Sequence, residues 1–143
     1  MVIALVADDP KKGLLTQFCT AYCGILAKHS IIATAVTGRY IEESTGLEIE
    51  KVLPGTHGGI QQIATRVLYN EIDAVVYFRD SDYEGPAPAE EDSVLRACDT
   101  KNIPFATNIA TAEILVMAIS DGLLDWREYV NPISPYSKAH RGN

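Results

Sequence analysis

The sequence lacks the features of a membrane protein or a general nucleic-acid-binding protein. No apolar run approaches the roughly 18 residues that a membrane span needs. The apolar start has no basic segment before it and is followed at once by Asp8 and Asp9, which predicts a buried strand rather than a signal peptide. Basic residues are few, since 12 Lys and Arg stand against 19 Asp and Glu, giving a net charge of −7. We therefore expect neither a membrane nor a nucleic acid as a partner.

Motifs for metals, redox chemistry and nucleotide cofactors are also missing. The three cysteines, Cys19, Cys23 and Cys98, form no CxxC pair, and no His and Cys residues share the spacing of a metal site. The chain contains neither GxGxxG nor a Walker lysine motif. We predict buried free thiols in a reducing cytoplasm, with no metal and no cofactor.

The composition that remains is that of an ordinary globular domain. The chain has 143 residues, of which 47% are apolar and 22% charged, and this predicts one domain over residues 1–143. Glycine and proline, at 10 and 7 residues, are close to their usual share. Disordered, collagen-like and disulfide-scaffold classes are therefore excluded.

Short β-rich runs alternate with helical patterns along the whole chain. The patterns predict strands at 2–7, 31–35, 49–53, 72–78 and 103–107, and helices at 11–27, 39–44, 60–69, 90–101 and 111–120. The run at 2–7 is apolar throughout, as expected for a strand buried on both faces. The predicted fold class is α/β, with a mostly parallel sheet covered by helices on both sides.

Polar and flexible residues follow the predicted strands, at the edge where parallel sheets bind ligands. A lysine, hydroxyls and glycines beside helix N-termini suit an anion, because free backbone N–H groups point outward there. The residues are Asp8, Lys12, Thr34, Thr37, Gly38, Gly55, His57, Gly58 and Asp80. Taken singly, each has a structural alternative: a tight turn for the glycines, a cap for the threonines or the aspartate, and a solvated surface for the lysine and the histidine. Their joint position predicts a pocket for a phosphate-like anion.

Several stretches at these positions resemble the methylglyoxal synthase family, in family order and at family spacing. They are IALVADDPKK (3–12), ATAVTG (33–38), STGLEI (44–49), LPGTHGGIQQI (53–63), IDAVVYFRD (72–80) and NIPFATNIATAE (102–113). The resemblance implies a compact three-layer sandwich around a five-stranded sheet, and assembly as a homohexamer. It also implies a reaction, the removal of phosphate from dihydroxyacetone phosphate after a carboxylate abstracts a carbon-bound proton.

The binding residues that this resemblance implies are largely present. Lys12 matches the lysine that holds the phosphate, and Thr34 and Thr37 match two members of a threonine cluster. Gly55 matches the glycine of the loop, and Asp80 matches a family aspartate. The resemblance therefore supports a phosphorylated small molecule as the ligand.

The departures from the family pattern include the residues that the resemblance assigns to catalysis. The family's catalytic base is the Asp of a GGDQQ segment, and this chain has Ile60 there, which cannot accept a proton. One family histidine falls within residues 85–88, which hold no titratable group, and another is replaced by Asp8. Val36 stands at the middle hydroxyl position of the threonine cluster, and Pro54 replaces a serine.

Three functions follow from this combination of kept and lost residues. The leading hypothesis is a catalytically degenerate protein, not an enzyme, that senses or sequesters a phosphorylated small molecule or a nucleotide-derived signal. The alternative is an active lyase that releases phosphate from dihydroxyacetone phosphate with an altered base, for which Asp80, His57 and Asp8 are the candidates. The third is an assembly or regulatory partner with a vestigial pocket.

The segment from about residue 121 to the end is expected to be a tail that packs on its own or a neighbouring subunit. Its aromatic residues favour packing, whereas the part beyond Ser137 has the composition of a frayed polar terminus. By the resemblance, this tail approaches a neighbouring subunit's pocket in the oligomer. Tyr136 and Arg141 are therefore additional candidate ligand contacts.

Overall fold

The protein is built on one five-stranded parallel sheet. The computed structural model describes residues 1–140. The strands are β1 (Val2–Ala7), β2 (Ser30–Thr34), β3 (Ile49–Val52), β4 (Ala74–Phe78) and β5 (Phe105–Ala106). Their order is β3-β2-β1-β4-β5, and every neighbouring pair runs parallel. The predicted α/β fold with a five-stranded sheet is confirmed, with no antiparallel strand among the described residues.

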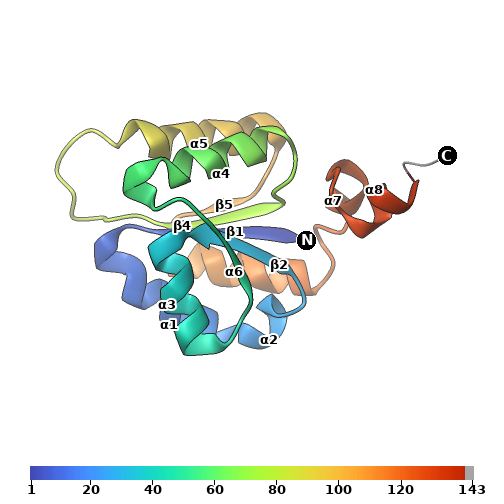
Figure 1. Cartoon of the computed structure of the whole chain (residues 1–143), viewed down its shortest axis with the longest axis horizontal. Helices are drawn as coiled ribbons and strands as arrows, with labels where there is room; N and C mark the ends of the chain where they lie inside the picture. The colour runs from blue at the N-terminus through green and yellow to red at the C-terminus, as the bar shows by residue number, and fades with distance from the viewer. Residues whose placement is uncertain (141–143) are drawn as a thin grey trace.

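Helices cover both faces of this sheet (Figure 1). They are α1 (Lys12–Ala21), α2 (Cys23–Leu26), α3 (Ala35–Thr45), α4 (Gly59–Leu68), α5 (Ala89–Lys101), α6 (Ile109–Ser120), α7 (Arg127–Val130) and α8 (Pro135–His140), with 3-10 turns η1 (Asp9–Lys11) and η2 (Gly55–His57). Helices α4 and α5 lie side by side on one face, and α1, α3 and α6 lie on the other (Figure 1). Within residues 1–140, no helix has both the length and the apolar character needed to cross a bilayer.

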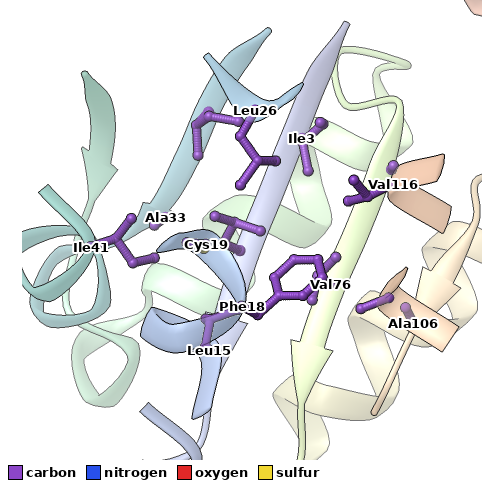
Figure 2. Packing of buried hydrophobic residues seen from close by; sticks show 14 of the residues in the cluster. Ile3, Leu15, Phe18, Cys19, Leu26, Ala33, Ile41, Val76, Ala106 and Val116 are labelled. Atoms are coloured by element: carbon purple, nitrogen blue, oxygen red, sulfur yellow. The ribbon is translucent and has the colours of Figure 1, made fainter. Parts of the chain in front are cut away.

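The two faces of the sheet carry separate hydrophobic cores. On one face Leu15, Phe18 and Cys19 of α1 pack against β1 and β4, as Figure 2 shows for Phe18 beside Val76. On the other face Ile63 and other residues of α4 pack with α5 over Ala4, Val6 and Val75. This double burial explains why β1 and β4 are apolar without alternation.

The cysteines are free, as the sequence predicts. Cys19 and Cys98 are buried and Cys23 is partly buried against the core. Burial raises the pKa of the Cys19 thiol to about 12, and burial raises the pKa of Cys98 to about 12 as well. Both thiols therefore stay protonated at neutral pH and pack as small apolar groups.

Several helix and strand boundaries differ from the sequence prediction. The predicted helix at 11–27 is divided at Tyr22 into α1 and α2. Helix α3 begins at Ala35, four residues before the predicted start at Arg39, so that Thr37 lies in its first turn. Strand β5 has two residues instead of five. Pro104 precedes it and has no N–H to donate to a neighbouring strand.

The tail is fixed to the amino edge of the sheet by a buried carboxylate. Asp73 precedes β4 and is 2% exposed, and its Oδ2 accepts hydrogen bonds from the Val2 N–H at 2.8 Å and from the Asn131 amide at 3.0 Å. The Arg127 guanidinium, which is fully buried, donates to Asp73 Oδ1 at 2.9 Å. The described part of the tail therefore packs on its own chain, at the start of β1 and β4.

The contribution of this buried ion pair can be compared with that of an exposed one. Replacing Arg127 by Leu leaves Asp73 charged and buried with one partner fewer, which lowers the free energy of unfolding by about 3–5 kcal/mol in urea denaturation. The matched control is Arg96→Leu, because Arg96 pairs with Asp92 at 2.7 Å with side chains 79% and 51% exposed. Arg96→Leu lowers the free energy of unfolding by less than about 1 kcal/mol. Equal losses in the two variants would contradict a special role for the buried pair.

Candidate functional site

The carboxyl end of β1 leads directly to a lysine that is partly enclosed. The Lys12 side chain is 19% exposed, and its ammonium donates to the Ala7 carbonyl at 3.3 Å. The same ammonium forms an ion pair with the exposed Asp9. This hydrogen bond, followed by the charge of Lys12, lowers the pKa of Asp9 below its usual value. Lys12 is therefore a cation held at the edge of the sheet with a replaceable surface counterion.

The first turn of α3 offers donors without partners. Thr34 occupies the N-cap position, 5% exposed, but its side chain makes no capping hydrogen bond. Thr37 is 2% exposed, and its hydroxyl is the buried side-chain polar group that lacks a hydrogen-bond partner in the described chain. The first N–H groups of any helix also lack intrahelical acceptors. A buried hydroxyl and a helix N-terminus together suit an anion.

The loop between β3 and α4 reaches the same edge. Gly55 lies against Ile60 and Thr34, since a Cβ there would be 3.5 Å from Ile60 Cδ1 and 4.0 Å from Thr34 Cγ2. Gly59 allows the tight turn into α4, because a Cβ would lie 1.8 Å from the Leu53 carbonyl oxygen. Ile60, in the first turn of α4, is partly buried and packs on the core of that face. The position that resembles the family base therefore holds a packed apolar side chain.

The ends of β1 and β4 are joined by the Asp8 carboxylate. Its Oδ2 accepts the Asp80 N–H at 2.7 Å, and its Oδ1 accepts the Tyr77 hydroxyl at 3.3 Å. Burial, followed by the charges of Asp8 and Glu91, raises the pKa of Tyr77, so the phenol stays protonated and serves as a donor. Asp80 Oδ1 accepts the Asp82 N–H at 3.0 Å, and no hydrogen bond engages its other oxygen within residues 1–140.

A hollow of about 640 Å³ opens beside these carboxylates. It is lined by Asp8, Asp9 and Asp80, by the loop after β4 and by residues that follow β5. Arg79 and the buried Glu91 also line it and form an ion pair at 2.8 Å. In Figure 1 the loop after β4 and the turn from β1 to α1 lie at the same end of the sheet. A small polar molecule can therefore contact Asp8 and Asp80 from this hollow.

The structure brings most of the predicted site residues to one edge. Asp8, Lys12, Thr34, Thr37, Gly55 and Asp80 all lie at the carboxyl ends of the strands. His57 and Gly58 are exposed in the loop before α4, where Gly58 has a φ of +95° and serves the turn. Gly38 is buried, and a Cβ at this position would lie only 2.9 Å from Lys51 Cγ. The glycine therefore permits close packing of α3 on β3.

Of the two predicted contacts in the tail, only Tyr136 is among the described residues, and it does not lie at this edge. Tyr136 belongs to α8, at the amino edge, and stacks on His140 with ring centroids 4.0 Å apart. Helix α8 lies at the opposite end of the sheet from the turn between β1 and α1 of its own chain (Figure 1). Arg141 lies outside the described residues.

Sequence reasoning missed three residues at this edge. Tyr77 falls within the predicted strand at 72–78 but is not among the predicted site residues, and the sequence does not predict the ion pair of Arg79 with Glu91. The available signal for Tyr77 was its hydroxyl, which needs a partner when the ring is buried. Nothing in the sequence pattern pairs Arg79 with Glu91, which lies on the following helix.

The sequence and the fold are similar to those of known proteins. The family model described as the MGS-like domain matches residues 15–107. A methylglyoxal synthase of Caldicellulosiruptor saccharolyticus is 52% identical over 132 residues, 92% of this chain and 94% of the relative. One of Thermoanaerobacterium thermosaccharolyticum is 44% identical over 90% of this chain and 96% of the relative. The crystal structure of methylglyoxal synthase from Elizabethkingia anophelis NUHP1 superposes with a TM-score of 0.74 at 37% identity, covering 80% of this chain and 76% of that one.

These relatives overturn the leading functional prediction. The hypothesis of a degenerate protein for sensing or sequestration is wrong, and so is the prediction that the chain is not an enzyme. Relatives 41–52% identical to it are named as a synthase. The prediction rested on the absence of the family base at Ile60 together with the absence of both family histidines. The structure places two other carboxylates, those of Asp8 and Asp80, at the same edge of the sheet.

The unpartnered hydroxyl of Thr37 provides a test of the anion site. Thr37→Val removes a buried polar group that has no partner, so the free energy of unfolding rises by about 1 kcal/mol in urea denaturation. The same change removes a donor to a bound anion, so the affinity for inorganic phosphate falls by about tenfold in calorimetric titration.

A threonine on the same helix serves as the control for Thr37. The Thr45 hydroxyl donates to the Ile41 carbonyl at 2.6 Å and accepts the Leu47 N–H at 3.1 Å. Thr45→Val therefore lowers stability and leaves phosphate binding unchanged. A loss of stability in Thr37→Val with unchanged phosphate affinity would remove Thr37 from the anion site.

Proposed function

Because the chain belongs to the MGS-like domain family, we propose that it is a lyase of the methylglyoxal synthase type, which converts dihydroxyacetone phosphate into methylglyoxal and phosphate. The observation that carries the proposal is the placement of Lys12 and the unpartnered Thr37 hydroxyl at the same sheet edge as Asp8 and Asp80. Lys12 and the Thr37 hydroxyl are suited to bind the phosphate group, and a carboxylate is suited to abstract a proton.

The phosphate binds between β1 and the N-terminus of α3. Lys12 supplies the positive charge, and its exposed partner Asp9 gives way to the incoming phosphate dianion. Thr37 donates its unpartnered hydroxyl, and the first N–H groups of α3 donate from the backbone. Thr34 and Gly55 form the adjoining wall, where the missing Cβ of Gly55 leaves room next to Thr34.

Asp80 is the general base in this proposal. Ile60 carries no titratable group, and the exposed His57 lies in the loop on the other side of Thr34. Both oxygens of Asp8 are engaged by Tyr77 and by the Asp80 N–H, so Asp8 orients the neighbouring loop. Asp80 retains an oxygen without a hydrogen bond among the described residues, and its other oxygen is held by the Asp82 N–H. An oriented carboxylate with one free oxygen is suited to accept a proton.

The reaction follows from removing a proton next to the carbonyl. Asp80 takes a proton from the hydroxymethyl carbon of dihydroxyacetone phosphate, and the electron pair forms an enediolate. The enediolate then expels phosphate: the carbon–oxygen bond at the far carbon breaks, the double bond shifts to that carbon, and the hydroxyl on the deprotonated carbon becomes the aldehyde as its proton leaves with the phosphate. The resulting enolate gains a proton at the far carbon and becomes methylglyoxal, and Asp80 returns its proton to solvent. Lys12 and the donors of α3 stabilise the negative charge that accumulates on the leaving phosphate.

The assembly and location belong to the same proposal. The whole chain, residues 1–143, acts as one domain and assembles as a homo-oligomer, a hexamer by the family resemblance, in the cytoplasm. An apolar groove of about 280 Å³ between β5 and α6, with the exposed Ile114 and Leu123, supports association with another copy. In the oligomer, Tyr136 and Arg141 of one subunit contact the ligand bound to its neighbour.

Removing the proposed base tests the mechanism. Asp80→Asn keeps an oxygen for the Asp82 N–H but cannot accept a proton at neutral pH. We expect kcat for methylglyoxal formation to fall at least about 100-fold, with the affinity for inorganic phosphate unchanged. Asp82→Asn is the matched control, because Asp82 is an exposed carboxylate of the same loop. It leaves kcat within about twofold of the parent.

A second substitution distinguishes the loss of the base from damage to the rest of the site. Adding Ile60→Asp to the Asp80→Asn variant places a carboxylate at the position of the family base and restores part of the lost turnover. If the unaltered protein forms no methylglyoxal from dihydroxyacetone phosphate, the proposed function is wrong. If it does and Asp80→Asn retains full activity, only the assignment of the base is wrong.

A further inference from the structure

A second hollow lies on the other side of Lys12, between α1 and α3. Its volume is about 510 Å³, and it is lined by Asp9, Lys12, Gly13, Thr16, Val36 and Tyr40. The three-carbon substrate of the proposed reaction needs far less space than this. The hollow is separate from the one beside Asp80, although Asp9 borders both.

One wall of this hollow is apolar and open to solvent. Val36 and Tyr40 are one turn apart on α3, and they are 39% and 53% exposed. Across from them Gly13 has nothing within 4 Å of the position that a Cβ would occupy. The Thr16 hydroxyl already donates to the Lys12 carbonyl at 2.8 Å. Apart from the Tyr40 hydroxyl, the wall formed by Val36 and Tyr40 therefore presents apolar surface.

The hollow also adjoins the groups to which the proposed function assigns the phosphate. Lys12 lines the hollow, and Val36 directly precedes Thr37, whose buried hydroxyl has no partner within residues 1–140. A phosphate held by Lys12 and the first turn of α3 therefore has this hollow beside it. The Asp9 carboxylate at the rim disfavours a second anionic group there, so a neutral apolar substituent fits best.

We propose that the hollow between α1 and α3 is an apolar subsite for phosphate esters with an aryl or branched alkyl group. The phosphate binds to Lys12 and α3, and the apolar group packs against Val36 and Tyr40. The subsite rests on the phosphate position of the proposed function but does not depend on lyase activity. Phosphate esters bound through this subsite compete with dihydroxyacetone phosphate for the same phosphate position.

Three ligands of increasing apolar size test the subsite. Inorganic phosphate, methyl phosphate and phenyl phosphate are titrated calorimetrically into the full-length protein. We expect phenyl phosphate to bind about tenfold more tightly than methyl phosphate, because the ring covers apolar surface on Val36 and Tyr40. In turnover assays, phenyl phosphate is a competitive inhibitor against dihydroxyacetone phosphate.

Substitutions on the apolar wall test whether the tighter binding of phenyl phosphate comes from this hollow. Tyr40→Ser removes most of the advantage of phenyl over methyl phosphate, and Val36→Thr reduces it, while both variants still bind methyl phosphate. The matched control is Tyr69→Ser, which removes an exposed tyrosine at the end of α4, on the other face of the sheet.

The possible results separate the subsite from the proposed function. Equal affinities for phenyl and methyl phosphate overturn the subsite, and so does an advantage that Tyr40→Ser leaves intact. If inorganic phosphate binds but phenyl phosphate does not, another copy of the chain or a steric block occupies the hollow, and the subsite is again refuted. If none of the three ligands binds, both the subsite and the phosphate position of the proposed function fail.

Discussion

Parallel pairing between β1 and β4 places Ala7 beside Phe78, and both strands leave the sheet in the same direction. The contacts between Asp8 and the end of β4 depend on this register, because Asp8 accepts the N–H of Asp80 and the hydroxyl of Tyr77. A shift of one residue would turn the side chains of β1 to the opposite faces of the sheet and would separate Asp8 from Tyr77. The two hydrophobic cores hold the register, because each face of β1 is buried against different helices.

The sequence was sufficient to predict the fold because its strongest signals are local. The apolar runs at 2–7 and 72–78 indicate buried strands wherever they lie, and the alternation with helices indicates parallel pairing. The boundary of α3 was harder to predict, because β-branched residues at Thr34, Val36 and Thr37 favour a strand. In the structure the chain turns after Thr34, and this turn moves Val36 and Thr37 into the first turn of a helix.

The chemistry of the site depends on contacts that no local pattern contains. Asp8 and Tyr77 are 69 residues apart in the chain, and only the order of the strands makes them neighbours. The missing partner of Thr37 is likewise a property of three-dimensional packing. Sequence comparison at Ile60 detected the loss of one carboxylate but could not detect that Asp80 has an oxygen available at the same edge. The functional prediction was wrong because it weighed the residues lost from the family pattern above the carboxylates that the fold keeps at the same edge.

The close approach of Gly59 to the Leu53 carbonyl also has a consequence for how such a site changes over time. Any side chain at Gly59 would collide with the backbone, so this residue specifies the path of the loop. Ile60, the next residue, sits in the first turn of α4, where a helix accepts apolar and acidic side chains alike. The shape of the loop and the identity of its reactive group are thus encoded by adjacent but independent residues. A single substitution at position 60 can add or remove a proton acceptor while the architecture around it persists.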